Sequence, residues 1–178
     1  MSQKGITINT LNDGQVDASD HALLFNAAFG DCGILNIGNK LKLSKISNNK
    51  VRMLDGFYMM SNGVIIRVEG FEDIDITSGT LGQKRIDLII AEYVKNGDKV
   101  GQDIAKIKVL SGKYSSTTAV APTLTKNDVT RQELIATLNI NETDMTIKSF
   151  DAKVLPNFKK ALTVLSESDD YIEVDYTL

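Results

Sequence analysis

The sequence has little of what most catalytic and metal sites are built from. It contains one cysteine and one histidine among 178 residues. A single cysteine, Cys32, excludes an intramolecular disulfide and a cysteine-based zinc site. We interpret Cys32 as a small buried apolar side chain, with a free reactive thiol as the alternative. Because His21 is the only imidazole and no nucleophile motif surrounds Cys32, we interpret His21 as a surface residue of a helix.

Long apolar runs and blocks of one charge are also missing. No stretch reaches the length of a transmembrane helix, and the N-terminal MSQKGITINTL lacks the apolar core of a signal peptide. We therefore expect a protein that folds in the cytoplasm and does not enter a membrane. The net charge of −3 is spread along the chain, without the basic stripe of a nucleic-acid-binding protein.

The sequence does contain many short strand patterns separated by turn signals. Residues 41–46, LKLSKI, alternate between apolar and polar side chains, and Asn62-Gly63 is a typical hairpin turn. Asp55-Gly56 predicts another turn, and residues 114–127 read as a surface loop. We expect 86–94 to pair with 104–110, while 133–140 fits a strand or a helix. The other predicted strands are 51–54, 57–60, 64–68 and 72–77.

Two segments are predicted to be helical. The first covers about 19–29, with Ser19 as its cap and Gly30 as its stop. The second covers 155–166, where four apolar residues recur at helical spacing and pack against the protein's own sheet or against a symmetry mate. After it comes an acidic, alternating strand or tail that can pair with a partner strand. The candidate interface residues here are Leu155, Phe158, Leu162, Leu165, Tyr171 and Tyr176.

Many strands with few helices between them predict a mainly β protein. We expect a β-sandwich or barrel-like domain with a short N-terminal helix and a short C-terminal helix. The domain is placed at 1–150, and the C-terminal helix with the acidic strand or tail at 151–178.

The stretch TSGTLGQKRIDLIIAEYV, residues 77–94, contains glycines and basic residues before an apolar run. It lacks the spacing of a phosphate-binding loop, which also needs a helix after it. We interpret Gly79 and Gly82 as turn residues. Arg85 and Asp87 then lie on one strand face and either form a local ion pair or satisfy backbone groups near a sheet edge.

Clustered acids at 72–75 and 13–20 raise the possibilities of sugar hydrolysis and of a metal site. Hydrolysis requires two carboxylates at a set separation in a cleft, and NDGQVDASD lacks the spacing of an EF-hand loop. We interpret Asp73 and Asp75 as a solvated strand face. The sequence predicts no catalytic residue, no cofactor and no metal site.

Five stretches, in order, resemble the N-terminal region of baseplate and tail-fibre proteins of tailed phages, or of phage-derived particles, of Gram-positive bacteria. They are ALLFNAAFG, GILNIGNKLKLS, VRMLDGFYMMSNGVIIRVEG, FEDIDITSGTLGQKRIDLIIAEYV and IAKIKVLSGKY. The resemblance covers about 22–114 and is most recognisable at 80–88. It implies a structural Gly-x-x-Arg-x-Asp turn, a homotrimer, other baseplate or tail proteins as partners, and a location in the virion tail. Family members are often longer, with a C-terminal fibre, sandwich or host-binding module, and we expect no receptor-binding head within these 178 residues.

These observations predict a non-enzymatic structural or adaptor protein that acts through protein–protein assembly. The alternative is a receptor-binding or carbohydrate-binding module with a host saccharide as partner, which we favour less because tryptophan is absent and aromatic residues make up only 6% of the chain. A third hypothesis is a cell-wall hydrolase that uses Asp73 and Asp75.

Overall fold

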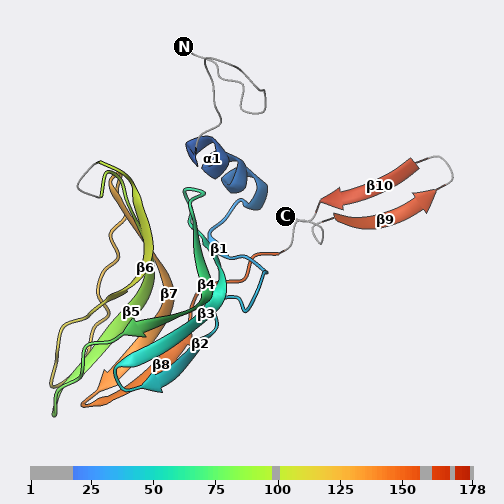
Figure 1. Ribbon diagram of the computed structural model, residues 1–178. Helices are drawn as coiled ribbons and strands as arrows, with labels where there is room; N and C mark the ends of the chain where they lie inside the picture. The colour runs from blue at the N-terminus through green and yellow to red at the C-terminus, as the bar shows by residue number, and fades with distance from the viewer. Residues whose placement is uncertain (1–17, 98–100, 157–161, 169–170, 177–178) are drawn as a thin grey trace.

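The computed structural model describes residues 18–97, 101–156, 162–168 and 171–176. These residues form one helix and ten strands, so the expected mainly β class is confirmed (Figure 1). The elements are α1 (Ala18–Phe29), β1 (Gly33–Ile34), β2 (Leu43–Ser47), β3 (Lys50–Met59), β4 (Ile65–Asp75), β5 (Lys84–Val94), β6 (Ile104–Leu110), β7 (Thr130–Asn141), β8 (Asp144–Phe150), β9 (Leu162–Ser168) and β10 (Tyr171–Tyr176).

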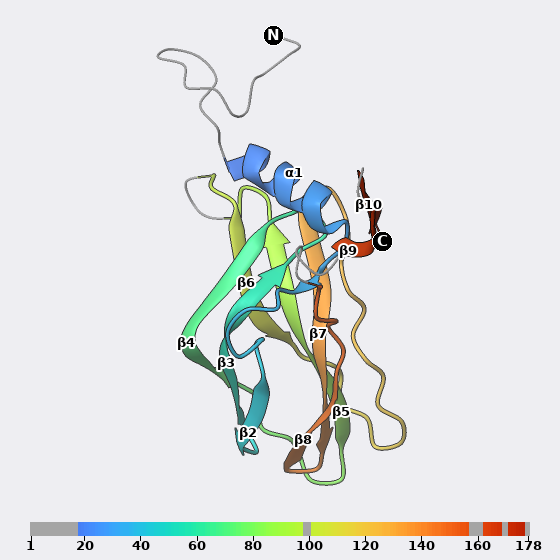
Figure 2. The same ribbon diagram turned by 90° about the vertical axis from the view of Figure 1, so that its right-hand side faces the viewer.

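Two antiparallel sheets form a sandwich-like domain. The first sheet has the order β1-β3-β2, with β4 also paired to β3, and the second sheet has the order β6-β5-β7-β8. Figure 2 shows the sheets facing each other with α1 across one end, and β4 lies near β6 while β2 lies near β8. No pairing in the described part of the chain joins the two sheets into a closed barrel.

The core lies between the sheets because alternate side chains of each strand point inward. One continuous apolar cluster takes residues from both layers. Its members include Val51, Met53, Tyr58, Ile66 and Ile74 from the first sheet, and Ile89, Ala91, Ile135, Leu138, Ile140 and Met145 from the second.

Most of the expected strands are present, including residues 133–140, for which the sequence allowed either a strand or a helix. Residues 133–140 lie in β7, so the helical alternative is wrong, and β5 pairs with β6 as expected. The Asn62-Gly63 hairpin joins β3 to β4, with Gly63 at a φ of 79°. The patterns at 64–68 and 72–77 belong to one strand, β4, which ends at Asp75.

The predicted turn at Asp55-Gly56 is wrong. β3 runs without a break through both residues, and the pairing register with β4 shifts between Leu54 and Gly56. Gly56 is needed for a close approach: a Cβ there would lie 2.7 Å from the backbone nitrogen of Leu41. Leu41 is fully buried and has a φ of 54°, which is not a strand conformation. It therefore lies before β2 and does not begin that strand as predicted.

Helix α1 confirms the N-terminal prediction. Gly30 follows its last turn with a φ of 66° and donates its N–H to the Asn26 carbonyl at 2.8 Å, as a left-handed helix stop requires. Because the helix already includes Ala18, Ser19 lies inside the first turn and is not its cap. No helix in the described ranges is long and apolar enough to cross a membrane.

The predicted C-terminal helix is wrong. Leu162 and Leu165 lie in β9, which pairs with β10 in an antiparallel hairpin that contains Tyr171 and Tyr176. Phe158 lies outside the described residues.

Leu155 is buried within its own molecule, in a second small cluster with Leu35 and Met59 on the outer face of the first sheet. The Leu155 N–H donates to the Ile34 carbonyl at 2.7 Å. The segment 151–155 thereby continues the sandwich.

Candidate interaction surface

The predicted Arg85–Asp87 pair is present and fully buried. Arg85 Nε donates to Asp87 Oδ1 at 2.8 Å, and Arg85 Nη2 donates to Asp87 Oδ2 at 2.9 Å. Both residues share the core-facing side of β5, since they alternate with outward residues in the same register as Ile89.

The pair also joins loops at one end of the sandwich. Arg85 Nη2 donates to the Thr77 carbonyl at 2.6 Å, and the Gly112 N–H donates to Asp87 Oδ1 at 2.9 Å. The Arg85 guanidinium carbon lies 4.7 Å from the centre of the Tyr114 ring. The two expected roles, an ion pair and a partner for backbone groups, are therefore both filled, and both side chains have structural partners.

Gly79 and Gly82 serve different needs in the turn before β5. Gly82 has a φ of 70° with open space around it, so it supplies the left-handed turn conformation. Gly79 is required for close packing, because a Cβ there would lie 1.7 Å from the Glu142 carbonyl oxygen.

Asp73 and Asp75 do not form a carboxylate pair in a cleft. Asp73 accepts two hydrogen bonds from Arg52, at 2.7 and 2.9 Å, and the pKa of its carboxyl is lowered by this contact. Asp75 lies 3.1 Å from Lys50 Nζ. Within the described ranges, no group of three or more His, Cys, Asp or Glu residues is arranged to hold a metal ion, and Asp13 and Asp17 lie outside them.

A buried polar cluster beneath α1 was not predicted. Glu133 Oε1 accepts from the Ser61 backbone N–H at 3.0 Å and from the Ser61 hydroxyl at 2.6 Å, and its Oε2 accepts from the Tyr58 hydroxyl at 3.3 Å. Arg131 Nη1 donates to Ser61 Oγ at 2.6 Å. These partners lie some seventy positions apart along the chain, so alternation patterns give no signal for them.

Cys32 borders this cluster and is half-buried. Burial raises the pKa of its thiol, and the nearby carboxylates of Glu133 and Asp31 raise it further. His21 is exposed on α1, as predicted, and no hydrogen bond joins it to Cys32 in the described part of the chain. The thiol is therefore not activated as a nucleophile.

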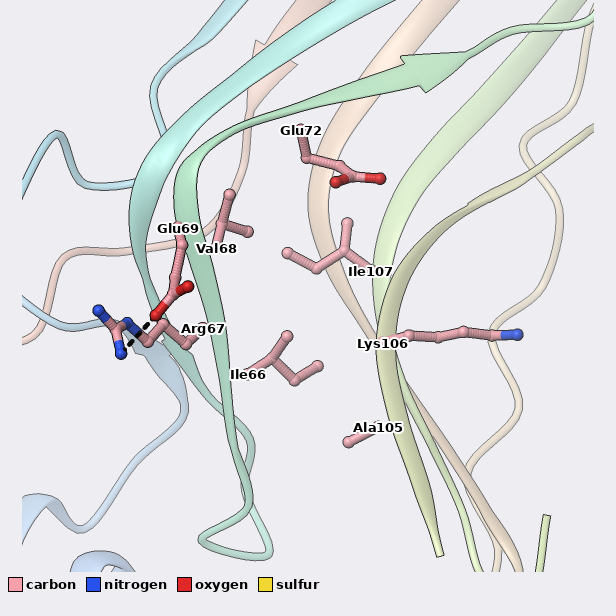
Figure 3. Close-up of a pocket in the computed structure, with 8 residues that line it drawn as sticks. All are labelled: Ile66, Arg67, Val68, Glu69, Glu72, Ala105, Lys106 and Ile107. Carbon is pink, nitrogen blue, oxygen red and sulfur yellow. Dashed lines mark ion pairs between the residues drawn. The ribbon is translucent and has the colours of Figure 1, made fainter. Parts of the chain in front are cut away.

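A groove opens along one flank of the sandwich, between the edge strands β4 and β6, with a volume of about 600 Å³. Figure 3 shows Ile66 and Val68 of β4 pointing across the gap toward Ile107 of β6. The Glu72 carboxylate also extends into the gap, while Arg67 and Glu69 form an ion pair on the opposite side of β4. The groove wall is thus mainly apolar.

A second hollow of about 460 Å³ continues the groove to α1. Ala105 lines both spaces, and Ala22 and Leu23 of α1 line the second one with Val64. Three consecutive large apolar side chains of α1 are exposed: Leu23 by 66%, Leu24 by 43% and Phe25 by 41%. We call the groove, the hollow and these three residues the flank surface.

The sequence predicted α1 but not the flank surface, whose two walls come from strands that are not neighbours in the chain. Compared with known proteins, the chain matches no protein-family model, and no curated protein matches it.

Proposed function

We propose that this chain is a non-enzymatic structural or adaptor protein that works by binding other proteins. The observation that carries the proposal is the exposure of Leu23, Leu24 and Phe25 within one turn of α1, where Leu23 also lines the hollow that continues the groove. Contiguous apolar surface bordered by polar residues is typical of protein–protein contact sites. Complete burial of a fully exposed side chain of this kind gains about 1.5–3 kcal/mol, and the partly exposed Leu24 and Phe25 gain a fraction of that.

The strand edges along the same flank support a protein partner. β4 is paired only with β3, and β6 only with β5, among the described strands. Unpaired edges present backbone N–H and C=O groups that an extended segment of another chain can bind. A partner on the flank surface therefore gains apolar contacts from α1 and backbone hydrogen bonds from an edge.

The resemblance in the sequence supports a place for this function in a phage tail. We propose that the chain belongs to the baseplate or tail fibre of a phage or phage-derived particle, as a homotrimer in contact with other tail proteins. The support is the order of motifs over residues 22–114, including the Gly-x-x-Arg-x-Asp turn. Closed rotational symmetry is the usual outcome for homo-oligomers.

Light scattering after size exclusion tests the self-assembly. We expect the wild-type chain to have the mass of a closed oligomer and Leu23→Glu to shift it toward monomer. Leu81→Glu is the matched control, because Leu81 is 74% exposed in a turn away from α1. A monomeric wild type, or equal dissociation by both variants, would count against self-assembly through the flank surface.

Electron microscopy tests the location. Antibodies against the chain should label the tail tips of particles prepared from the organism that encodes it. Labelling of no particle would overturn the proposed location and leave the binding function to be tested by the masses above.

A receptor-binding or carbohydrate-binding role is the second candidate. It is favoured by one observation, a pocket whose lining includes Asn139 and Asn141. Asparagine amides both donate and accept hydrogen bonds, as sugar hydroxyls require.

A further inference from the structure

A second concave site lies on the outer face of the second sheet, apart from the flank surface. Its volume is about 400 Å³. Arg85 and Ile140 contribute to its wall from the core side of their strands. The remaining lining residues are Lys84, Ile86, Ala119, Asn139, Asn141 and Lys148.

Strand pairing brings the polar members together. Lys84 of β5 stands opposite Asn141 of β7, and Ile86 stands opposite Asn139. These positions alternate with the core-facing Arg85 and Asp87, so they share the outer face.

Lys148 and Ala119 complete the pocket. The pairing of β7 with β8 matches Thr137 to Ser149 and Leu138 to Ile147, which leaves Lys148 as an extra, bulged residue. Bulges change the direction of a side chain and often occur beside functional sites. Two hydrogen bonds between the Lys84 and Ser115 backbones, at 2.7 and 2.9 Å, hold the loop that supplies Ala119.

The side chains of the two lysines and the two asparagines of this pocket have no partners in the described part of the chain. Neither lysine ammonium takes part in an ion pair, and neither asparagine amide takes part in a hydrogen bond, although Asn139 is half-buried. No lining residue is acidic. The nearby Asp144 is already bound by Lys45 at 2.8 Å, and the Arg85 guanidinium is bound by Asp87.

The pocket is therefore a small cationic site in a protein whose net charge is −3. Two free ammonium groups attract an oxyanion, and the amides supply donors and acceptors in the same space. The half-buried Asn139 amide, without a protein partner, must bond to water or to a ligand.

We propose that this pocket binds a phosphorylated sugar or polyol. Lys84 and Lys148 bind the phosphate, and Asn139 and Asn141 bind hydroxyls of the attached sugar or polyol. The amides suit this ligand because a hydroxyl uses both the donor and the acceptor of an amide. This inference does not rest on the proposed assembly function, since no residue of the flank surface lines the pocket.

Isothermal titration of the full chain with glucose 1-phosphate tests the proposal. We expect saturable binding that weakens with added salt, and a loss of about tenfold in affinity for Lys84→Gln and for Lys148→Gln, since each removes a charged hydrogen bond. Lys42→Gln removes the same charge from an exposed position in the segment before β2 and should leave the affinity unchanged. Asn139→Ala should weaken binding of the ester and leave binding of inorganic phosphate unaltered.

Several results would overturn the proposal. They are the absence of saturable binding, equal affinity for glucose and its phosphate, an equal loss in the Lys42→Gln control, and tighter binding of an acidic peptide than of the ester. Unchanged thermal melting of each variant verifies folding. The Leu23→Glu variant should bind the ester normally, so a failure of the assembly proposal and a failure of this one give different results.

Discussion

Arg85 and Asp87, two residues apart on β5, form a doubly hydrogen-bonded ion pair that is almost completely enclosed, with Nε–Oδ1 and Nη2–Oδ2 distances of 2.8 and 2.9 Å. Removing one partner leaves a buried charge without compensation. We expect Asp87→Asn to lower the free energy of unfolding by about 3–5 kcal/mol, measured by urea denaturation.

The Arg52–Asp73 pair is the control for this prediction. It has the same two-bond geometry, but both side chains are about one-third exposed. Asp73→Asn should therefore have a much smaller effect, because water replaces the lost partner. Equal effects of the two substitutions would mean that burial does not determine the role of Asp87.

The two glycines of the turn before β5 should respond differently to alanine. Gly82→Ala adds a methyl group in open space at a positive φ and should cost about 1 kcal/mol. Gly79→Ala places a methyl group against the Glu142 carbonyl and should cost about 3 kcal/mol or more. Urea denaturation of both variants checks the order, and a larger loss for Gly82→Ala would contradict the assigned roles.

Alternation predicted the strands well because one face of each is buried, as at Ile89 and Ala91 in β5. The sequence-based prediction failed where a short local pattern indicated a turn or a helix that does not form. Asp55-Gly56 reads as a turn, but Gly56 lies within β3 and makes room for Leu41. The spacing of Leu162 and Leu165 suggested a helix, although the threonine and valine between them favour the strand that forms.

Tyr93 should titrate at unusually high pH. Its hydroxyl donates to Asp103 Oδ2 at 2.5 Å, and this hydrogen bond, with burial, raises the pKa of Tyr93 to about 12. The folded state keeps this proton after the unfolded state loses it, so the contribution to stability is complete below pH 10 and is lost as the pH rises toward 12. Phenolate absorbance of wild type minus Tyr93→Phe isolates this group.

Asp103→Asn is the matched test for Tyr93. Without the carboxylate charge, the Tyr93 midpoint should move toward its ordinary value of 10. A midpoint near 10 in the wild type would show that the Tyr93–Asp103 contact does not persist in solution.

The Cys32 thiol should react slowly in the folded protein. Its raised pKa keeps it protonated, and the thiolate is the reactive form. Alkylation at mildly alkaline pH should be slower than that of free cysteine and should reach the rate of free cysteine in urea. Fast alkylation without urea would support the alternative of an exposed, reactive thiol.

The candidate sites were less predictable than the fold, because their residues meet only through the topology. Arg85 and Asp87 were found since they are neighbours on one strand. The flank surface combines Val68 of β4 with Ile107 of β6, and the pocket on the second sheet includes Lys148, which is bulged. Neither a cross-sheet contact nor a bulge leaves a periodic signal in the sequence.

Two backbone hydrogen bonds of Ile34, to Lys153 and Leu155, determine how the domain would respond to a pulling force. The Ile34 N–H donates to the Lys153 carbonyl at 2.8 Å, and the Leu155 N–H donates to the Ile34 carbonyl at 2.7 Å, so the segment after α1 is bonded to the segment that leaves the sandwich. Their strand directions are parallel. A force transmitted from α1 to the β9–β10 hairpin would therefore be resisted at these two hydrogen bonds and the Leu155 cluster, and the main core between the sheets would remain unstretched.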